Sequence, residues 1–146
     1  MSFFGGRNSA RPPRESGNEY AVTTNGHAVV YVVDDDDAVR DSLTALFESH
    51  DLRVEAFGSG EEFLAAVAPE RGGCVVLDLH LPVMGGLQIL SRMGERKIGI
   101  PVIVITGGGD EKEMRMARES GAAMVMEKPL DHRQLIANVQ KAMAHT

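Results

Sequence analysis

The sequence predicts an α/β protein in which a parallel sheet is covered by helices on both faces. Five short apolar segments alternate with five amphipathic segments between residues 28 and 144. Most of the apolar segments lack the strict apolar–polar alternation of a half-exposed strand, which favours strands buried on both faces. Glycine, proline or capping residues separate the segments. The expected fold class is therefore a five-stranded, doubly wound (βα)5 sheet with right-handed crossovers.

The first unit begins with a strand at residues 27–33, which is apolar almost throughout. Four acids follow, Asp34 to Asp37. We expect Asp37 to cap the next helix, because an aspartate side chain accepts hydrogen bonds from the free amides of a first turn. Apolar residues at helical spacing carry that helix to about Glu48.

The second and third units follow the same plan. Residues 53–57 alternate and predict an outer strand, after which Ser59 opens a Ser-x-x-Glu capping box and a second helix. The third strand, residues 74–78, is a short apolar run that ends at Asp78. A turn rich in proline and glycine then leads into a third helix at residues 86–97.

The last two units place two more polar residues at strand ends. Their strands are expected at residues 100–106 and 122–127, and their helices at residues 110–120 and 131–144. Thr106 ends the first of these strands and is followed by three glycines, which suit a loop that must move. The second strand leads into Lys128 and Pro129.

Composition fits one ordinary globular domain preceded by a tail. Hydrophobic residues make up 43% and charged residues 25% of the chain. Residues 1–26 combine arginines with glycine, serine, asparagine and proline and have no apolar period, so we expect a flexible N-terminal tail before a folded domain at residues 27–146.

Charge and cysteine content exclude several classes. The formal net charge of −6 argues against direct nucleic-acid binding or binding to anionic membranes. No apolar run reaches the length of a membrane span, and the first residues lack the apolar core of a signal peptide. The one cysteine, Cys74, excludes an internal disulfide and a cysteine-based zinc cluster. Together these features predict a cytoplasmic protein.

Four strand ends carry groups that are expected to meet. Asp34 and Asp35 end the first strand, Asp78 the third, Thr106 the fourth and Lys128 the fifth. Parallel strands point their carboxyl ends to one edge of a sheet, where sites of open α/β sheets form. Asp78 taken alone also fits a turn or capping acid, but the other three strand ends favour a functional site.

The chemistry of these groups indicates phosphoryl transfer. Three neighbouring carboxylates repel one another, which raises the pKa of at least one of them, and a cation relieves that repulsion. Oxygen ligands without a histidine or cysteine cluster suit Mg²⁺, which leaves room for a phosphate oxygen. Lys128 offers a charge and Thr106 a hydroxyl donor to phosphate. Asp78 would then attack phosphorus.

These motifs resemble the receiver domain of bacterial response regulators, the CheY-like superfamily. The resemblance covers about residues 28–144, and it is nearest to receivers of the nitrogen-fixation and nodulation regulators. It is carried by Asp34-Asp35 after Tyr-Val-Val, Asp78 before Leu-His-Leu-Pro, Thr106 in Val-Ile-Thr-Gly, and Lys128-Pro129. The resemblance implies a flavodoxin-like strand order of 2-1-3-4-5.

The resemblance also implies roles at the matching positions. Asp78 would accept phosphate from a phosphohistidine of a sensor histidine kinase or a phosphotransfer protein. Lys128 would pair with the phosphoryl group, and Thr106 would move toward it. The Mg²⁺ ligands would be Asp35, Asp78 and the backbone carbonyl of His80, with Asp34 assisting through water. The peptide bond before Pro129 would be cis.

The implied partners are proteins. A downstream protein target would bind the face formed by residues 110–120, 122–127 and 131–144, and the same resemblance leaves open a phosphorylation-dependent homodimer. Adaptable methionines gather there, and half of them are expected to face the core. They are Met114, Met116, Met124 and Met126.

The sequence departs from the family pattern at two positions, and a third position bears on the lifetime of the phosphoryl group. Val125 stands where an aromatic residue usually takes part in the switch, so an aromatic rotation is not available there. Leu130 replaces the usual phenylalanine after Lys-Pro. His80 lies two residues after Asp78, at a position that tunes phosphoryl lifetime in this family, and either orients a water or lines the rim of the site.

We interpret the chain as a single-domain response regulator, a phosphorylation-controlled interaction switch in two-component signalling. It is not expected to be an enzyme, beyond assisting its own phosphorylation and dephosphorylation. One alternative is a degenerate receiver that binds partners without phosphate, and another is the receiver fragment of a DNA-binding transcription factor. A haloacid-dehalogenase type of phosphohydrolase is disfavoured, because its second aspartate is replaced by His80.

Overall fold

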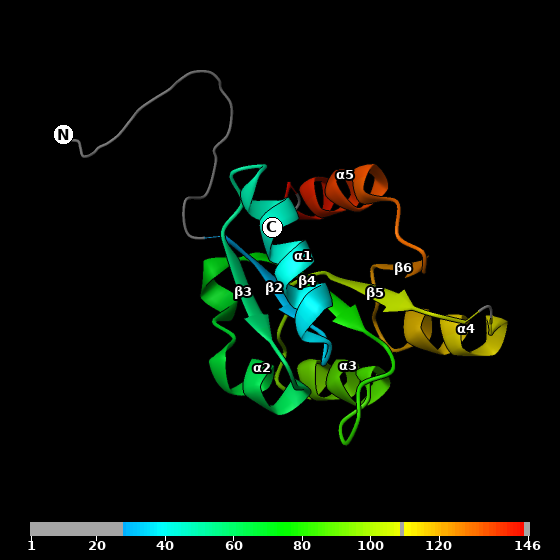
Figure 1. The fold of residues 1–146 in the computed structure, drawn as a ribbon. Helices are drawn as coiled ribbons and strands as arrows, with labels where there is room; N and C mark the ends of the chain where they lie inside the picture. The colour runs from blue at the N-terminus through cyan, green and yellow to red at the C-terminus, as the bar shows by residue number, and fades with distance from the viewer. Residues whose placement is uncertain (1–27, 109, 145–146) are drawn as a thin grey trace.

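A parallel sheet runs through the centre of the fold (Figure 1). The computed structural model describes residues 28–108 and 110–144, so the predicted tail at residues 1–26 lies outside the described residues. The strands are β2 (Val29–Val33), β3 (Val54–Phe57), β4 (Gly73–Asp78), β5 (Val102–Thr106) and β6 (Met124–Glu127). Their order, β3-β2-β4-β5-β6, is 2-1-3-4-5 in chain order and confirms the predicted fold class.

Helices cover both faces of this sheet, as the alternation predicted. They are α1 (Asp37–Glu48), α2 (Gly60–Ala66), α3 (Gly86–Glu95), α4 (Glu111–Glu119) and α5 (His132–Met143), with a short 3₁₀ helix at Pro69–Arg71. Helices α1 and α5 pack on one face, and α2, α3 and α4 pack on the other. None of the helices in the described part of the chain is long and apolar enough to cross a membrane.

Strand β2 shows why its sequence is apolar throughout. Tyr31 faces the α2–α4 side, where its ring stacks at 6.4 Å from that of Phe57 and meets Phe63 edge-on at 5.6 Å between centroids. Val30 and Val32 face the α1–α5 side and pack with Phe47. All five residues of β2 are buried, so both faces of the strand are covered, which explains the absence of an apolar–polar alternation.

Two helix starts are informative. The expectation that Asp37 caps α1 is wrong: the side chain of Asp36 accepts from the amides of Ala38 and Val39, and Asp37 occupies the first turn. The chain turns immediately after β2, because the carboxylate of Asp34 accepts a hydrogen bond from the amide of Asp36. The helix therefore starts one residue earlier than a cap at Asp37 would allow. One of the two hydrogen bonds of the predicted capping box forms: Ser59 Oγ accepts from the backbone amide of Glu62 at 3.2 Å.

The carboxyl ends of four strands lie at one edge of the sheet. Val33 of β2 pairs with Leu77 of β4, so the residues that follow them, Asp34 and Asp78, are neighbours. Asp78 in turn pairs with Ile105 of β5, one residue before Thr106. The sheet register therefore brings together residues that are more than 90 positions apart, from Asp34 to Lys128.

Candidate functional site

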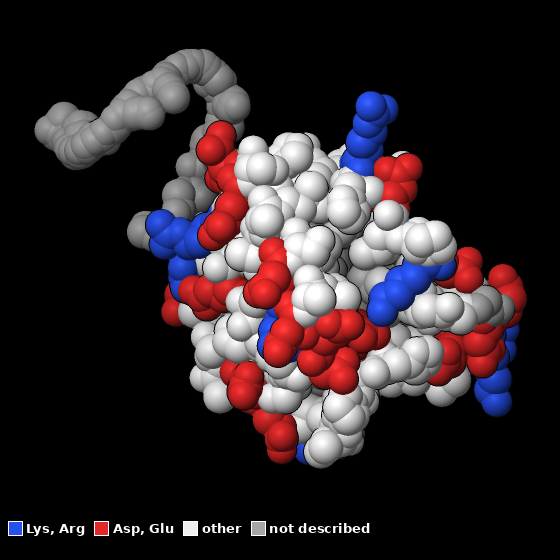
Figure 2. Space-filling model, in the orientation of Figure 1, with Lys and Arg blue, Asp and Glu red and all other residues white. Residues whose placement is uncertain are grey.

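An acidic cluster forms at this edge. One carboxylate oxygen from each of Asp34, Asp35 and Asp78 lies within 4.8 Å of the others. Asp34 and Asp78 are only 6% and 7% exposed, whereas Asp35 is open to solvent. Figure 2 shows acidic side chains gathered in the middle of the face that carries the ends of β2 and β4. The cluster thus has two buried members and one that reaches into solvent.

Backbone amides hold the two buried carboxylates in place. Asp34 Oδ1 accepts from the amide of Asp36 at 2.9 Å, and Asp78 Oδ1 accepts from the amide of His80 at 3.0 Å. Arg40 Nη1 on α1 also donates to the backbone carbonyl of Asp34 at 2.7 Å. These bonds orient both carboxylates and leave oxygen lone pairs for another ligand.

The electrostatic balance of the cluster is unfavourable to negative charge at Asp34. Burial is the main cause that raises the pKa of Asp34 above its usual value of 3.8, and the neighbouring carboxylates of Asp78 and Asp35 act in the same direction. The hydrogen bond from the Asp36 amide and the charge of Lys128 lower it, but they do not prevail. A cation bound among these carboxylates would offset the repulsion between their negative charges.

Thr106 ends β5, and Lys128 directly follows β6 and lines the same hollow as Asp34 and Asp78. The backbone amide of Lys128 donates to the carbonyl of Thr106 at 2.8 Å, and the bond between Lys128 and Pro129 is cis, as predicted. Thr106 is fully buried, and its hydroxyl oxygen accepts the amide of Gly108 at 3.4 Å. Lys128 thus contributes a charge near the carboxylates, while the Thr106 hydroxyl is directed at its own loop.

The hollow beside the cluster is small. Asp34, Asp78 and Lys128 line it together with seven apolar residues, and it measures about 10 Å³, which is the room of a single water. A larger ligand must approach from the solvent side, where Asp35 is exposed. A much larger cavity of about 820 Å³ lies at the opposite edge of the sheet, beside Gly72 and Pro101, so cavity size does not locate this site.

Comparison with known proteins decides the family. The response regulator receiver domain family matches residues 30–140. The chain belongs to the response regulator receiver family. Receiver domains are signalling domains rather than catalysts of a metabolic reaction.

The relatives of this receiver include regulators of nitrogen fixation and nodulation. The transcriptional regulatory protein FixJ of Azorhizobium caulinodans is 41% identical over 117 residues, covering 80% of this chain and 56% of FixJ. Nodulation protein W of Bradyrhizobium diazoefficiens is 41% identical over 115 residues, covering 79% of this chain and 51% of the relative. The receiver chain spans about half the length of the curated relatives it matches.

Solved structures agree with this fold. The crystal structure of FixJ-N matches with a TM-score of 0.75 and 38% identity, covering 82% of this chain and 95% of that one. The response regulator StyR matches with a TM-score of 0.76 and 33% identity, covering 81% of this chain and 60% of that one. The resemblance to nitrogen-fixation receivers, inferred from short motifs, is thereby confirmed.

The acidic residues of the receiver fit Mg²⁺. Asp34, Asp35 and Asp78 offer only oxygen donors, and receiver domains generally bind Mg²⁺ at an acidic pocket. The sequence also predicted the backbone carbonyl of His80 as a ligand, and this stays a prediction. The amide of His80, in contrast, is placed by its bond to Asp78.

Two contacts of the receiver were not predicted from its sequence. Arg40 supports the acidic loop through the carbonyl of Asp34, and nothing in its helical position signalled that contact. The ring of His80 contacts Glu113 on α4, with 2.8 Å between Nε2 and Oε2. Val125 of β6 is half-buried against the α2–α4 side of the core, so an aliphatic side chain occupies the position of the usual switch aromatic.

Proposed function

We propose that this receiver accepts a phosphoryl group on Asp78 from a phosphohistidine of a sensor histidine kinase or a phosphotransfer protein. The observation that carries the proposal is the meeting of Asp34, Asp35 and Asp78 within 4.8 Å, with Lys128 and the buried Thr106 at the ends of the neighbouring strands. These five groups come from four different strand ends, and an acid with a purely structural role would need none of the others. Convergence of this kind supports a chemical role.

The reaction requires little covalent chemistry from the protein. A carboxylate oxygen of Asp78 attacks phosphorus, the bond from phosphorus to the donor's imidazole nitrogen breaks, and an acyl phosphate forms. Lys128 pairs with the phosphoryl oxygens, and the hydroxyl of Thr106 turns from Gly108 to donate to them. Mg²⁺ held by Asp35, Asp78 and the His80 carbonyl, with Asp34 assisting through water, would neutralise charge on the transferring group.

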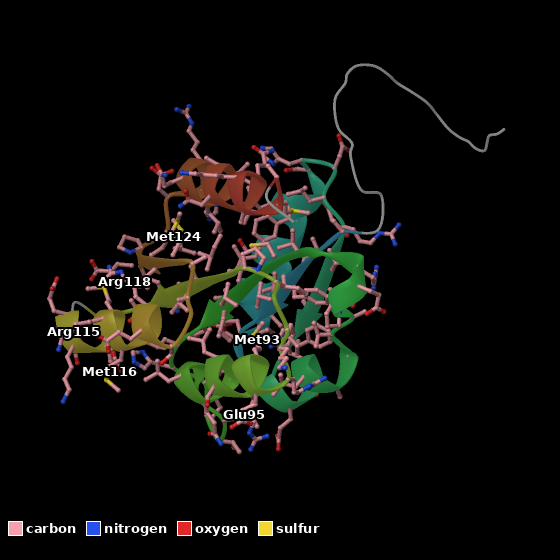
Figure 3. The ribbon with its side chains drawn as sticks, turned by 180° about the vertical axis from the view of Figure 1, so that it is seen from behind. Met93, Glu95, Arg115, Met116, Arg118 and Met124 are labelled. Atoms are coloured by element: carbon pink, nitrogen blue, oxygen red, sulfur yellow. The ribbon has the colours of Figure 1, made fainter. Side chains whose placement is uncertain are left out.

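The modified receiver then acts as an interaction switch. We propose the face formed by α4, β6 and α5 as the output surface for a downstream protein or a second copy of the chain. Figure 3 shows Arg115 and Met116 on the outer side of α4. Met116 is exposed and Met114 is buried, so the methionines of this helix divide between surface and core as predicted.

The proposed unit is residues 27–146, in the cytoplasm. The net charge of −6 on the full 146-residue chain supports output through protein contact rather than direct nucleic-acid contact. The matched region covers only 56% of FixJ and 51% of nodulation protein W, and FixJ is named a transcriptional regulator. An output of that class would be carried by sequence outside the region matched here.

Intact mass after incubation with acetyl phosphate tests the proposal. We expect one phosphoryl adduct that depends on Mg²⁺ and is absent from Asp78→Asn. Asp41→Asn, which removes the same charge from the exposed side of α1, serves as the matched control and should be labelled like the wild type.

Two outcomes would contradict the proposal. Equal labelling of Asp78→Asn would move the phosphoryl group to another residue. Absence of any adduct, together with failure to bind beryllofluoride in the presence of Mg²⁺, would favour the phosphate-independent binding module instead. Beryllofluoride separates this case from an adduct that hydrolyses too quickly to be seen, because it mimics the phosphoryl group without being hydrolysed.

A further inference from the structure

The ring of His80 joins the loop after Asp78 to helix α4. His80 Nε2 and Glu113 Oε2 are 2.8 Å apart, although the residues are separated by 33 positions. An ionised carboxylate only accepts hydrogen bonds, so the imidazole nitrogen is the donor. Within residues 28–108 and 110–144, no other side-chain hydrogen bond links this loop to α4.

Helix α4 is otherwise weakly attached to the site. Only Met114 and Ala117 of this helix are buried. The chain between Thr106 and Asp110 consists of glycines, and a Cβ at Gly108 would meet no atom within 4 Å. The side chain of Asp110 caps the helix by accepting from two of its first amides, so the first turn keeps its own hydrogen bonds when it moves.

We propose that the His80–Glu113 contact is a latch that couples the chemical state of Asp78 to the position of α4. Glu113 is here a positioning residue that acts through His80, and the proposal rests on the phosphoacceptor role of Asp78. His80 also donates its backbone amide to Asp78, so one residue contacts both the acceptor and the helix.

Phosphorylation opens the latch by competition. The phosphoryl group carries a charge of about −1.5 to −2 in place of the single negative charge of the Asp78 carboxylate, and it brings three strong acceptor oxygens beside His80. The ring N–H that now donates to Glu113 can then donate to a phosphoryl oxygen, and the new charge repels the Glu113 carboxylate. Loss of this contact frees the first turn of α4, and it does so without any rotation at Val125.

A matched pair of variants tests the latch. Glu113→Gln and Glu111→Gln remove the same charge from the same turn, but Glu111 is exposed and, among the described residues, its side chain forms no hydrogen bond with the loop. Two quantities are measured on the full chain: amide hydrogen exchange along α4 in the unmodified protein, and the equilibrium affinity for beryllofluoride with Mg²⁺. Because coupling between binding equilibria is reciprocal, a latch that the phosphoryl mimic opens must also oppose binding of that mimic.

We expect Glu113→Gln to speed α4 exchange and to tighten beryllofluoride binding by about twofold to fivefold, the range for a partly exposed contact between a basic and an acidic side chain. Glu111→Gln should match the wild type in both. In a His80→Ala background the effect of Glu113→Gln should vanish, since the partner is already gone.

Three results would overturn the latch. The first is equal behaviour of the two glutamine variants. The second is an effect of Glu113→Gln that persists in His80→Ala. The third is faster α4 exchange with unchanged beryllofluoride affinity, which would make the contact purely structural. A wild-type protein that binds beryllofluoride but shows one of these results refutes the latch alone. A wild-type protein that neither binds the mimic nor becomes labelled refutes the phosphoacceptor role and removes the trigger of the latch with it.

Discussion

The backbone amide of Lys128 donates to the backbone carbonyl of Thr106 at 2.8 Å. This bond extends the β5–β6 ladder beyond the last strand pair, in which Thr106 stands opposite Glu127. The main chains of the two residues proposed to contact the phosphoryl group are therefore fixed to each other. Any response to phosphorylation at this point must come from their side chains and from the glycine loop that follows Thr106.

Replacing Thr106 by valine should separate labelling from response. Valine keeps the shape of the fully buried side chain but removes the hydroxyl that would turn from Gly108 to the phosphoryl group. We expect Thr106→Val to be labelled at Asp78 by acetyl phosphate while most of the beryllofluoride-induced shift of α4 amide resonances is lost. Thr106→Ser should keep both. A Thr106→Val protein with a wild-type α4 response would show that the hydroxyl is not part of the switch.

Two glycines of α3 should respond to alanine in opposite ways. A Cβ at Gly86 would lie 2.8 Å from the Cα of Leu79 and 3.1 Å from the carbonyl oxygen of Asp78, whereas a Cβ at Gly94 would meet nothing within 4 Å. Gly86→Ala should lower the free energy of unfolding by roughly 1–3 kcal/mol through overpacking. Gly94→Ala should raise it by roughly 0.5–1 kcal/mol, since alanine favours the helix. Urea denaturation measures both, and equal effects would contradict the close packing of Gly86.

The strand ends were predictable because each is a sharp change in residue type. Asp78 and Thr106 end β4 and β5 as expected, since a buried apolar run stops there and the polar residue can reach the edge of the sheet. Parallel pairing then brings those ends together without further information. The candidate site follows from the same rule, which is why its acidic residues could be named before the fold was known.

Other features depend on local backbone or distant packing that the sequence does not signal. Four identical acids offer the same capping chemistry, and the turn after β2 selects Asp36 instead of Asp37. Val83, just beyond the Asp78 loop, adopts a left-handed φ of 66° and is 93% exposed. A left-handed backbone is usually signalled in a sequence by glycine or asparagine, and a β-branched valine gives no such signal. The contact between His80 and Glu113 requires α4 to lie over a loop 33 residues earlier in the chain.

Neutralising Asp34 should stabilise the receiver in the absence of Mg²⁺. Burial first, and then the charges of Asp78 and Asp35, raise the pKa of Asp34 above 3.8. Ionisation of Asp34 therefore costs nothing below the pKa that Asp34 has in the unfolded chain. As pH rises through its higher pKa in the folded state, the free energy of unfolding falls. At neutral pH we expect Asp34→Asn to raise Tm by a few degrees, about 2–4 °C, because asparagine can still accept the Asp36 amide.

Magnesium provides the check on Asp34. Addition of Mg²⁺ should raise the Tm of the wild type, because the cation neutralises the same carboxylates, and it should raise the Tm of Asp34→Asn less. Asp41→Asn, an exposed change on α1, should behave like the wild type in both conditions. Thermal unfolding at pH 7 and at pH 4 should show the stability advantage of Asp34→Asn shrinking at the lower pH. An advantage that is constant with pH would locate the effect in packing rather than charge.

Cys74 should make unfolding easier at high pH. Burial raises the pKa of this fully buried thiol from 9.0 to about 12. Between these two pKa values the thiol of Cys74 keeps its proton in the folded state and loses it in the unfolded state. The contribution of Cys74 to the free energy of unfolding is therefore fully present below pH 9.0 and falls as pH rises toward the folded pKa. The contribution of Cys74 to the free energy of unfolding should decline by about 1.4 kcal/mol per pH unit in that interval.

Cys74→Ala isolates this contribution. The alanine variant loses some packing at every pH, but the pH-dependent part of the difference between the two proteins belongs to the thiol, because all other titrating groups are shared. Urea denaturation between pH 8 and pH 11 should show the gap between wild type and variant narrowing above pH 9.0. A water-soluble thiol reagent at pH 8 should modify Cys74 only after unfolding, since the folded protein holds it protonated and out of solvent. Two results would show that the start of β4 opens readily to solvent. One is a difference in the free energy of unfolding between wild type and variant that stays constant with pH, and the other is modification of the folded protein at the rate of a free thiol.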